Sequence, residues 1–384
     1  MVSPAGNTSG TEAANSSKPL PPHPTAATAT AITIPDNSTT HTSAPIINTK
    51  PGASIYSKPL MLTAYDKYVL GFSMTHLWRC PSKTILIPLF RQNFRAEKHL
   101  DIGVGTGFFI GDALAERLAK DEHLMPLERD QDSKLVQPEI EITLMDLNAV
   151  ALEKAKGRIM GVVNKHKAAR AAACGHGHGN VGSGSGKKSG HARANVASGQ
   201  TTVKVTTIQA DVLDKSLVFP HGKLSEISSK QFKSVSMFNL LHCLPAAPEA
   251  QGGQEIKNRA FKLAAACLAD NGVLVGCTIL GQKYIANPSR PSSSGGTGSG
   301  SGVPVRKGGS VGRTTSSKKQ PLILERGMTW TVMKWYNATG VFGNWADERE
   351  GFEKGLRENF EVVETHVEGC MLLFNAARPR RSEL

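Results

Sequence analysis

Three glycines in the segment HLDIGVGTGFFI, residues 99–110, follow an apolar run that contains an acid. Gly103, Gly105 and Gly107 leave the backbone bare, so a ligand can approach the main chain closely. The run before them suits a buried parallel strand, and the apolar spacing after them suits a helix. Strand, glycine turn and helix in this order are typical of a nucleotide-binding α/β unit. A tight turn without a ligand is the alternative.

The spacing of the motif indicates which nucleotide it would bind. A dinucleotide fingerprint G-x-G-x-x-G needs a glycine at position 108, where the sequence has Phe108. Asp101, two residues before the first glycine, would repel a pyrophosphate and suits a cationic group better. The order D-x-G-x-G-x-G resembles motif I of the class I S-adenosylmethionine (SAM)-dependent methyltransferases. In that family the glycines pass the nucleoside, and the acid lies near the positively charged methionine end.

Strands alternate with helices along the rest of the chain, which predicts an α/β fold with a mainly parallel, doubly wound sheet. The predicted strands are 98–102, 139–145, 201–211, 232–245, 273–280, 360–367 and 370–375, and later helices are predicted from 149, over 254–269 and near 346–358. The ending, one helix and then two strands close in sequence, resembles the seven-stranded, Rossmann-like methyltransferase sheet. The last strand of that sheet inserts antiparallel beside its predecessor.

Acids also end the second and third predicted strands, at Asp146 and Asp211. Ligands of doubly wound sheets bind at the carboxyl ends of the strands, so these acids are expected beside Asp101. A carboxylate at Asp146 can accept hydrogen bonds from both hydroxyls of a ribose. The resemblance implies that Asp211 lies near the adenine amine and that Leu147 covers an adenine face. Each acid alone is equally explained as a solvated turn residue or a helix cap.

The resemblance implies roles for three more residues. Asn239 and His242 lie at the end of the fourth predicted strand, which borders the transferred methyl group in this fold. Asn239 is expected at the cofactor, and His242 is the candidate general base for a hydroxyl or phenol acceptor. The alternative for His242 is a buried histidine bonded to backbone. Arg79, in a helix before the first strand, could meet the methionine carboxylate or could be a solvated residue of a covering helix.

Two further patterns have competing explanations. Four aromatic residues follow the fifth strand, where the family places substrate-pocket walls, and they could stack on an aromatic acceptor or belong to the core: Trp330, Trp335, Tyr336 and Trp345. The spacing Cys174-x-His176-x-His178 resembles a zinc motif. It lies in a glycine-rich tract without a fourth ligand close by, so we expect no metal site there.

Composition divides the chain into a tail and one domain. Residues 1–58 are rich in Ser, Thr, Ala, Asn and Pro and are expected to be disordered, ahead of a methyltransferase domain at 59–384. Low-complexity insertions are expected at about 161–200 and 286–320. Residues 154–204 hold ten Lys/Arg and no acid, and 283–334 hold nine against one acid, so the net charge of +13 belongs to these windows. A nucleic-acid partner is therefore not indicated for the core, although the insertions could contact RNA or anionic surfaces.

The predicted protein is a cytoplasmic methyltransferase. Six scattered cysteines favour reduced thiols, and no apolar run approaches membrane-spanning length. Four segments also resemble a fungal methyltransferase subgroup often found near natural-product genes: 65–81, 234–245, 273–281 and 339–378. This implies SAM as cofactor and a small-molecule acceptor, with O-methylation of an aromatic or polyketide-like metabolite expected. The alternatives are a methyltransferase that acts on RNA or protein recruited by the basic insertions, and a SAM-binding module without turnover.

Overall fold

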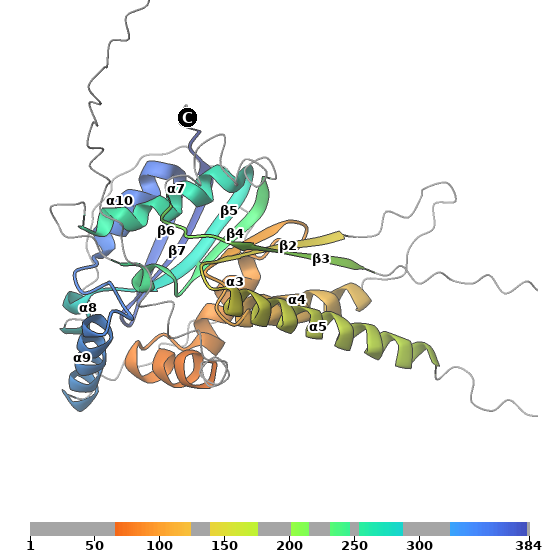
Figure 1. Ribbon diagram of the computed structural model, residues 1–384, viewed down its shortest axis with the longest axis horizontal. Helices are drawn as coiled ribbons and strands as arrows, with labels where there is room; N and C mark the ends of the chain where they lie inside the picture. Colours follow the sequence, from red (N-terminus) through yellow and green to blue (C-terminus); the bar gives the residue numbers. More distant parts are fainter. Residues whose placement is uncertain are drawn as a thin grey trace, which may run out of the picture. The chain divides into compact units, whose positions relative to one another are not determined.

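Seven strands form one sheet in a computed structural model of the protein, in the order β3-β2-β1-β4-β5-β7-β6 (Figure 1). The strands are β1 His99–Ile102, β2 Glu139–Asp146, β3 Thr202–Gln209, β4 Phe232–Phe238, β5 Leu268–Ile279, β6 Phe360–Glu368 and β7 Met371–Pro379. Strands β1 to β5 are parallel, and β7 lies antiparallel between β5 and β6. The structure describes residues 66–123, 139–175, 201–214, 231–245, 253–286 and 323–381. The predicted doubly wound sheet with an inserted antiparallel last strand is confirmed.

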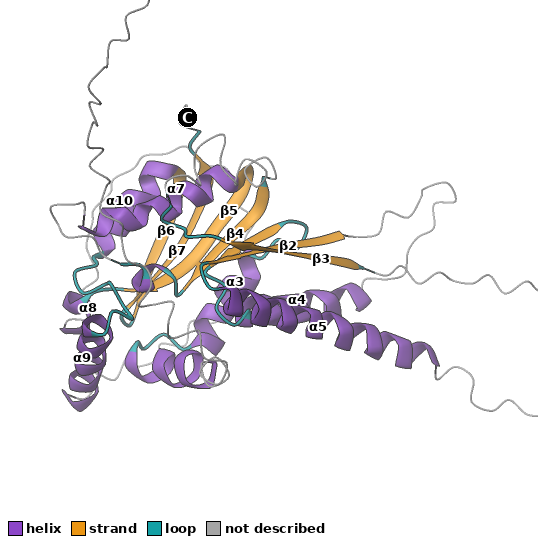
Figure 2. Ribbon diagram, in the orientation of Figure 1, coloured by secondary structure: helices purple, strands orange, loops and turns teal. Residues whose placement is uncertain are grey.

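Helices cover both faces of the sheet, and each face has its own apolar core (Figure 2). On one face lie α3 Ile87–Asn93, α4 Phe108–His123 and α5 Ala149–Gly175; on the other lie α7 Asn258–Cys267 and α10 Arg349–Asn359. The remaining helices are η1 Asp66–Leu77, η2 Ser82–Leu86, η5 Leu241–Cys243, η7 Gly253–Lys257, α8 Gln282–Ala286 and α9 Ile323–Ala338. All of these elements belong to one compact unit.

Strands β1 and β4 present different kinds of side chain to the two faces. Leu100 and Ile102 of β1 pack with Val235 and Met237 of β4 in the core that α7 and α10 cover. On the opposite face, four alternate residues of these strands are polar: His99, Asp101, Ser234 and Ser236. The His99 ring contacts Phe90 of α3, with 5.6 Å between the ring centroids. The pairing register sets His99 beside Ser234 and Asp101 beside Ser236. The sheet thus carries a small buried polar block next to the glycine turn.

Three element boundaries differ clearly from the predictions. Strand β4 ends at Phe238 rather than 245, because Asn239 turns the chain with a positive φ and the short helix η5 follows. Helix α5 runs to Gly175, past the expected start of the first insertion near 161, because the stretch is rich in Ala and Lys and favours helix. Strand β5 begins at Leu268 rather than 273, because Leu268 already pairs with Phe232 ahead of a register shift. Asn148 caps α5 as expected: its Oδ1 accepts a hydrogen bond from the Val150 amide at 2.8 Å.

Several expectations fall on residues outside the described ranges. They include the disordered tail at 1–58, most of both insertions, and His176 and His178 of the zinc-like pattern. In the described part of the chain, no helix has the length and apolar character needed to cross a membrane. The five cysteines whose side chains are described are free thiols.

Candidate functional site

A cavity of about 130 Å³ lies at the carboxyl edge of the sheet, beside the glycine turn. Its wall comes from the ends of β1 to β4, the first turns of α4 and α5, and Leu70 of η1. Seven of the predicted cofactor residues line it: Asp101, Gly103, Gly105, Asp146, Leu147, Asp211 and Asn239. The structure therefore brings together residues from four separate strand ends, as expected for this class of sheet.

The three glycines of the turn all have positive φ, but their surroundings differ. A Cβ at Gly105 (φ +52°) would have no atom within 4 Å, so this position faces open space. A Cβ at Gly107 would lie 2.8 Å from the Cα of Ala155 in α5. Gly107 is absent from the cavity wall. Its small size is needed for the close approach of two helices, whereas Gly105 exposes backbone to the cavity.

Asp101 is a buried acid and Asp146 a partly buried one, and both line the cavity. Burial raises the pKa of Asp101 to about 7; a hydrogen bond from Ser236 opposes the shift, and the charge of Asp146 adds to it. Burial also raises the pKa of Asp146, against hydrogen bonds from backbone amides that include that of Asn148, 2.9 Å from its Oδ1. Two neighbouring acids with raised pKa values favour a positively charged ligand beside them.

The β3 side of the cavity combines an acid with an apolar surface. Asp211 Oδ1 accepts a hydrogen bond from the Leu213 amide at 2.9 Å, which fixes the turn after β3. Gln209 donates to the Leu147 carbonyl at 3.1 Å and ties the ends of β2 and β3 together. The Leu147 side chain is 36% exposed and lines the cavity. A flat apolar ring could lie on it with its polar edge toward Asp211.

Asn239 occupies the turn after β4 with a left-handed backbone (φ +58°), which asparagine tolerates better than most residues. Its amide donates to the Cys277 carbonyl at 3.0 Å, and its Oδ1 lies 3.5 Å from the Cys277 Sγ. Both contacts bind the turn to β5. Asn239 therefore lines the cavity from a rigid position.

His242 is absent from the cavity wall, in contrast to its expected place beside the methyl group. Its side chain is 3% exposed, and its Nδ1 accepts a hydrogen bond from the Ile279 amide at 3.3 Å. The ring packs edge-on against Phe342, with 4.6 Å between the centroids. Burial, assisted by the charge of Lys257, lowers the pKa of His242 to about 3. In the structure the ring is thus buried, neutral and bonded to backbone, which is the geometry that the alternative explanation expects.

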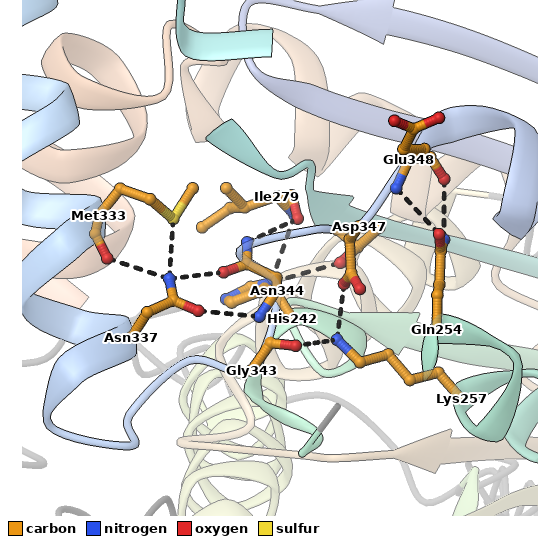
Figure 3. A network of polar contacts seen from close by, with 11 residues as sticks. His242, Gln254, Lys257, Ile279, Met333, Asn337, Gly343, Asn344, Asp347 and Glu348 are labelled. Atoms are coloured by element: carbon orange, nitrogen blue, oxygen red, sulfur yellow. Dashed lines mark hydrogen bonds and ion pairs between the residues drawn. The ribbon is translucent and has the colours of Figure 1, made fainter. Parts of the chain in front are cut away.

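A closed polar network surrounds His242 (Figure 3). Lys257 Nζ donates to Asp347 Oδ2 at 2.6 Å and to the Gly343 carbonyl at 2.8 Å, and both side chains of the ion pair are at most 2% exposed. Asn344 Nδ2 donates to the Ile279 carbonyl at 2.9 Å. These contacts fasten the segment after α9 to β5 and η7. The charges of this network are neutralised within the protein.

Arg79 is also absent from the cavity wall. Its guanidinium Nη2 lies 3.1 Å from the Cys370 Sγ, at the turn between β6 and β7. A Cβ at Gly369 would lie 2.2 Å from the Trp78 carbonyl oxygen and 2.7 Å from the Arg79 Cβ, so this turn is packed directly against the Arg79 segment. Arg79 therefore joins the segment before β1 to the turn between β6 and β7.

A contact that the sequence analysis did not identify joins η1 to the glycine turn. Thr106 Oγ1 donates to Asp66 Oδ1 at 2.6 Å, and the other oxygen of Asp66 pairs with Arg158 of α5. The guanidinium of Arg158 also stands 5.7 Å from the centroid of the Phe108 ring. Leu70, one turn after Asp66, forms part of the cavity wall. No local pattern predicts this contact, because the three partners lie far apart in the sequence.

None of the four aromatic residues after β5 lines the cavity. Trp335 is 58% exposed and Trp330 is 42% exposed on α9. Tyr336 packs on Phe342 with 4.7 Å between ring centroids, and Trp345 meets Trp330 edge-on at 6.2 Å. These rings form a separate cluster over α9, partly in contact with solvent.

Comparison with known proteins gives relatives along most of the chain, although no protein-family model matches it. The O-methyltransferase NEC2 of Pyricularia oryzae is 30% identical over 330 residues, covering 85% of this chain and 92% of that protein. The physcion biosynthesis cluster O-methyltransferase of Aspergillus chevalieri is 28% identical over 332 residues, covering 86% and 97%. Among solved structures, an O-methyltransferase family protein from Burkholderia thailandensis aligns over 85% of this chain and 62% of its own, with a TM-score of 0.41 and 10% identity.

Proposed function

The chain belongs to the class I SAM-dependent methyltransferases, in the group that includes these fungal O-methyltransferases, and from that premise we propose that it transfers the methyl group of SAM to an oxygen of an aromatic or polyketide-like small molecule. One observation carries the proposal. Among the described residues, the cavity wall contains three carboxylates and no Lys, Arg or His. Such a wall suits a ligand with positive charge, as SAM has on its sulfonium and its ammonium, and would repel a pyrophosphate.

The cavity wall fits SAM residue by residue. Asp146 would accept the ribose hydroxyls, because its carboxylate has acceptor positions beyond the one that the Asn148 amide uses. Leu147 would cover one face of the adenine, and Asp211 would accept from its exocyclic amine. Asp101 would face the methionine ammonium. Gly105, open on its Cβ side, allows the nucleoside to lie against the backbone.

Bound SAM would supply a methyl group that its sulfonium already activates, so the protein has mainly to orient the acceptor and exclude water. Leu70, Leu244 and Pro245 give an apolar wall on the side toward η1 and the end of β4. No histidine belongs to the described wall. A phenol loses its proton more easily than an aliphatic alcohol and needs less help from a base. The composition of the wall therefore supports a phenolic acceptor.

Calorimetry with S-adenosylhomocysteine (SAH), followed by incubation with labelled SAM and a panel of phenolic and aliphatic alcohols, tests the proposal. We expect SAH to bind and label to appear in phenolic products. Asp146→Ala should weaken SAH binding on the order of 100-fold, since two charge-assisted hydrogen bonds are lost. Asp270→Ala is the matched control, because this carboxylate is 87% exposed and lies outside the cavity wall. Absence of SAH binding by the wild-type protein would exclude the function.

A further inference from the structure

A buried chain of hydrogen bonds leads from the amino-terminal side of the sheet to Asp101. The Arg95 amide donates to the Ser234 Oγ at 2.9 Å. Ser234 Oγ lies 2.7 Å from His99 Nδ1, and His99 Nε2 lies 3.0 Å from Ser236 Oγ. Ser236 in turn donates to Asp101 Oδ1. His99, Ser234 and Ser236 are each 0% exposed, so water does not compete for these bonds.

The donor and the acceptor of each hydrogen bond in this series follow from its two ends, the Arg95 amide and the Asp101 carboxyl group. Burial lowers the pKa of His99 to about 3, so the ring is neutral and carries a single N–H. An ionised Asp101 accepts the proton of Ser236, whose oxygen must then accept from His99 Nε2–H. Nδ1 is left as an acceptor for the Ser234 hydroxyl, and Ser234 accepts from the Arg95 amide. Every donor then has an acceptor.

A proton on Oδ1 of Asp101 does not fit this arrangement. If Asp101 donated to Ser236, the proton of Ser236 would go to His99 Nε2, and the ring proton would sit on Nδ1. Ser234 would then receive two donors, one from Nδ1–H and one from the Arg95 amide, which cannot reverse. Among the described residues its own proton would lack an acceptor, and such a group is costly in a buried site. The fixed amide at one end thus keeps Oδ1 of Asp101 as the acceptor of the Ser236 proton, and a hydrogen bond donated to a carboxyl group favours its ionised form.

We propose that His99, Ser234 and Ser236 are positioning residues that orient Asp101 and favour its ionised form as the acceptor for the ammonium group of the cofactor. The inference rests on the proposed function, since it assigns these residues to the SAM site. Asp101 lines the cavity, whereas the three residues behind it are absent from the wall and act through it. The groups that act on Asp101 are the Ser236 hydroxyl from β4 and the Asp146 carboxyl from β2, while His99 on the same strand stays neutral.

The test measures SAH affinity between about pH 5.5 and about pH 8.5 in wild type and variant side by side, so that any loss of the ligand's own ammonium charge at the upper end is common to both. The pKa of Asp101, raised to about 7 by burial, makes affinity fall as the pH drops through this range, because a neutral acid no longer pairs with the ammonium. Ser236→Ala removes the bond that opposes the shift, so the pKa of Asp101 rises further. We expect the midpoint of the profile to move up by about one pH unit.

Matched ligands and variants separate this role from a structural one. The ligand 5′-methylthioadenosine shares the nucleoside and thioether of SAH but lacks the ammonium, and its affinity should be the same in wild type and Ser236→Ala. Ser236→Thr, which keeps the hydroxyl, should restore the wild-type midpoint. Thr143→Val removes a fully buried hydroxyl of β2 that is not part of this series of hydrogen bonds, and it should leave the midpoint unchanged.

The outcomes distinguish the two proposals. SAH binding with the same midpoint in wild type and Ser236→Ala would overturn the inference and leave the proposed function standing. Failure of the wild type to bind either ligand would overturn the proposed function. A measurement on the unmodified full chain needs no variant: nitrogen NMR of labelled histidine should show His99 with its proton on Nε2. A proton on Nδ1 would overturn the inference.

Discussion

Two parts of the carboxyl edge of the sheet hold buried titratable groups, and they treat charge in opposite ways. Beside the glycine turn, Asp101 and Asp146 face a cavity whose described wall has no cation. Around η7 and the end of β5, Lys257 is bonded to Asp347, and His242 is bonded to the Ile279 amide. In the first region, no cationic side chain of the described wall balances the carboxylates. The second balances its charge internally.

The difference shows that polar side chains at the ends of parallel strands can have very different surroundings. Asp101 lies near the end of β1, and His242 lies in η5 after the end of β4. Both side chains are at least nine-tenths buried. What separates them is the neighbouring space: one borders a cavity, and the other is enclosed by Phe342 and the Ile279 amide. Perturbed pKa values occur in both regions, so geometry must decide which of them binds a ligand.

The largest expected effect is on stability, in the region where Lys257 and Asp347 form a buried ion pair. Lys257→Met leaves Asp347 buried without its partner and should lower the free energy of unfolding by about 3–5 kcal/mol in urea titrations. Replacing both partners, as Lys257→Met with Asp347→Leu, should recover most of this loss. SAH affinity of the folded fraction should stay within about threefold of wild type. A large loss of SAH affinity in the double variant would show that the two regions are not separate.

A smaller effect on stability, but a decisive one on binding, is expected at the glycine turn. Gly105→Arg places a long cation in the open space of the cavity and should reduce SAH affinity on the order of 100-fold. Gly107→Ala is the matched control, because its Cβ would collide with Ala155 in α5 and not with a ligand. We expect this variant to lower the melting temperature while SAH affinity is kept. Thermal denaturation and calorimetry on both variants measure the two effects.

The smallest effect is expected for His242→Asn, in which the new amide oxygen can accept from Ile279. If His242 is structural, kcat should fall by less than about tenfold. The folded pKa of His242, lowered to about 3, lies below its unfolded value of 6.5, so the folded state binds fewer protons between these values. Stability is therefore lost as the pH falls through this window, and the variant should lose less. A drop in kcat above about 100-fold with unchanged SAH affinity would instead make His242 a catalytic base.

The sequence was sufficient for the features that depend on local spacing. The alternation of strands and helices predicted the sheet, and the strand ends predicted that Asp101, Asp146 and Asp211 meet at one edge. These predictions succeeded because parallel strands bring their carboxyl ends to the same edge, whatever the loops between them.

The features that the sequence did not predict depend on partners far along the chain. His242 is enclosed by residues about 40 and 100 positions later, Ile279 and Phe342. The Ser236 contact with Asp101 spans 135 positions. One signal was nevertheless available, since His99-x-Asp101 and Ser234-x-Ser236 have the period of two that puts polar residues on one face of adjacent strands.

The shared carboxylate of Asp66 has a consequence for how a ligand could leave the cavity. Because the Asp66 side chain contacts both Thr106 in the turn and Arg158 in α5, η1 cannot lift away without breaking an ion pair. Both charged side chains are partly exposed, at 19% and 29%, so dissolved ions can weaken their attraction. We therefore expect the dissociation rate of a bound nucleoside to rise with ionic strength, because salt weakens the ion pair that holds η1 against the glycine turn and α5.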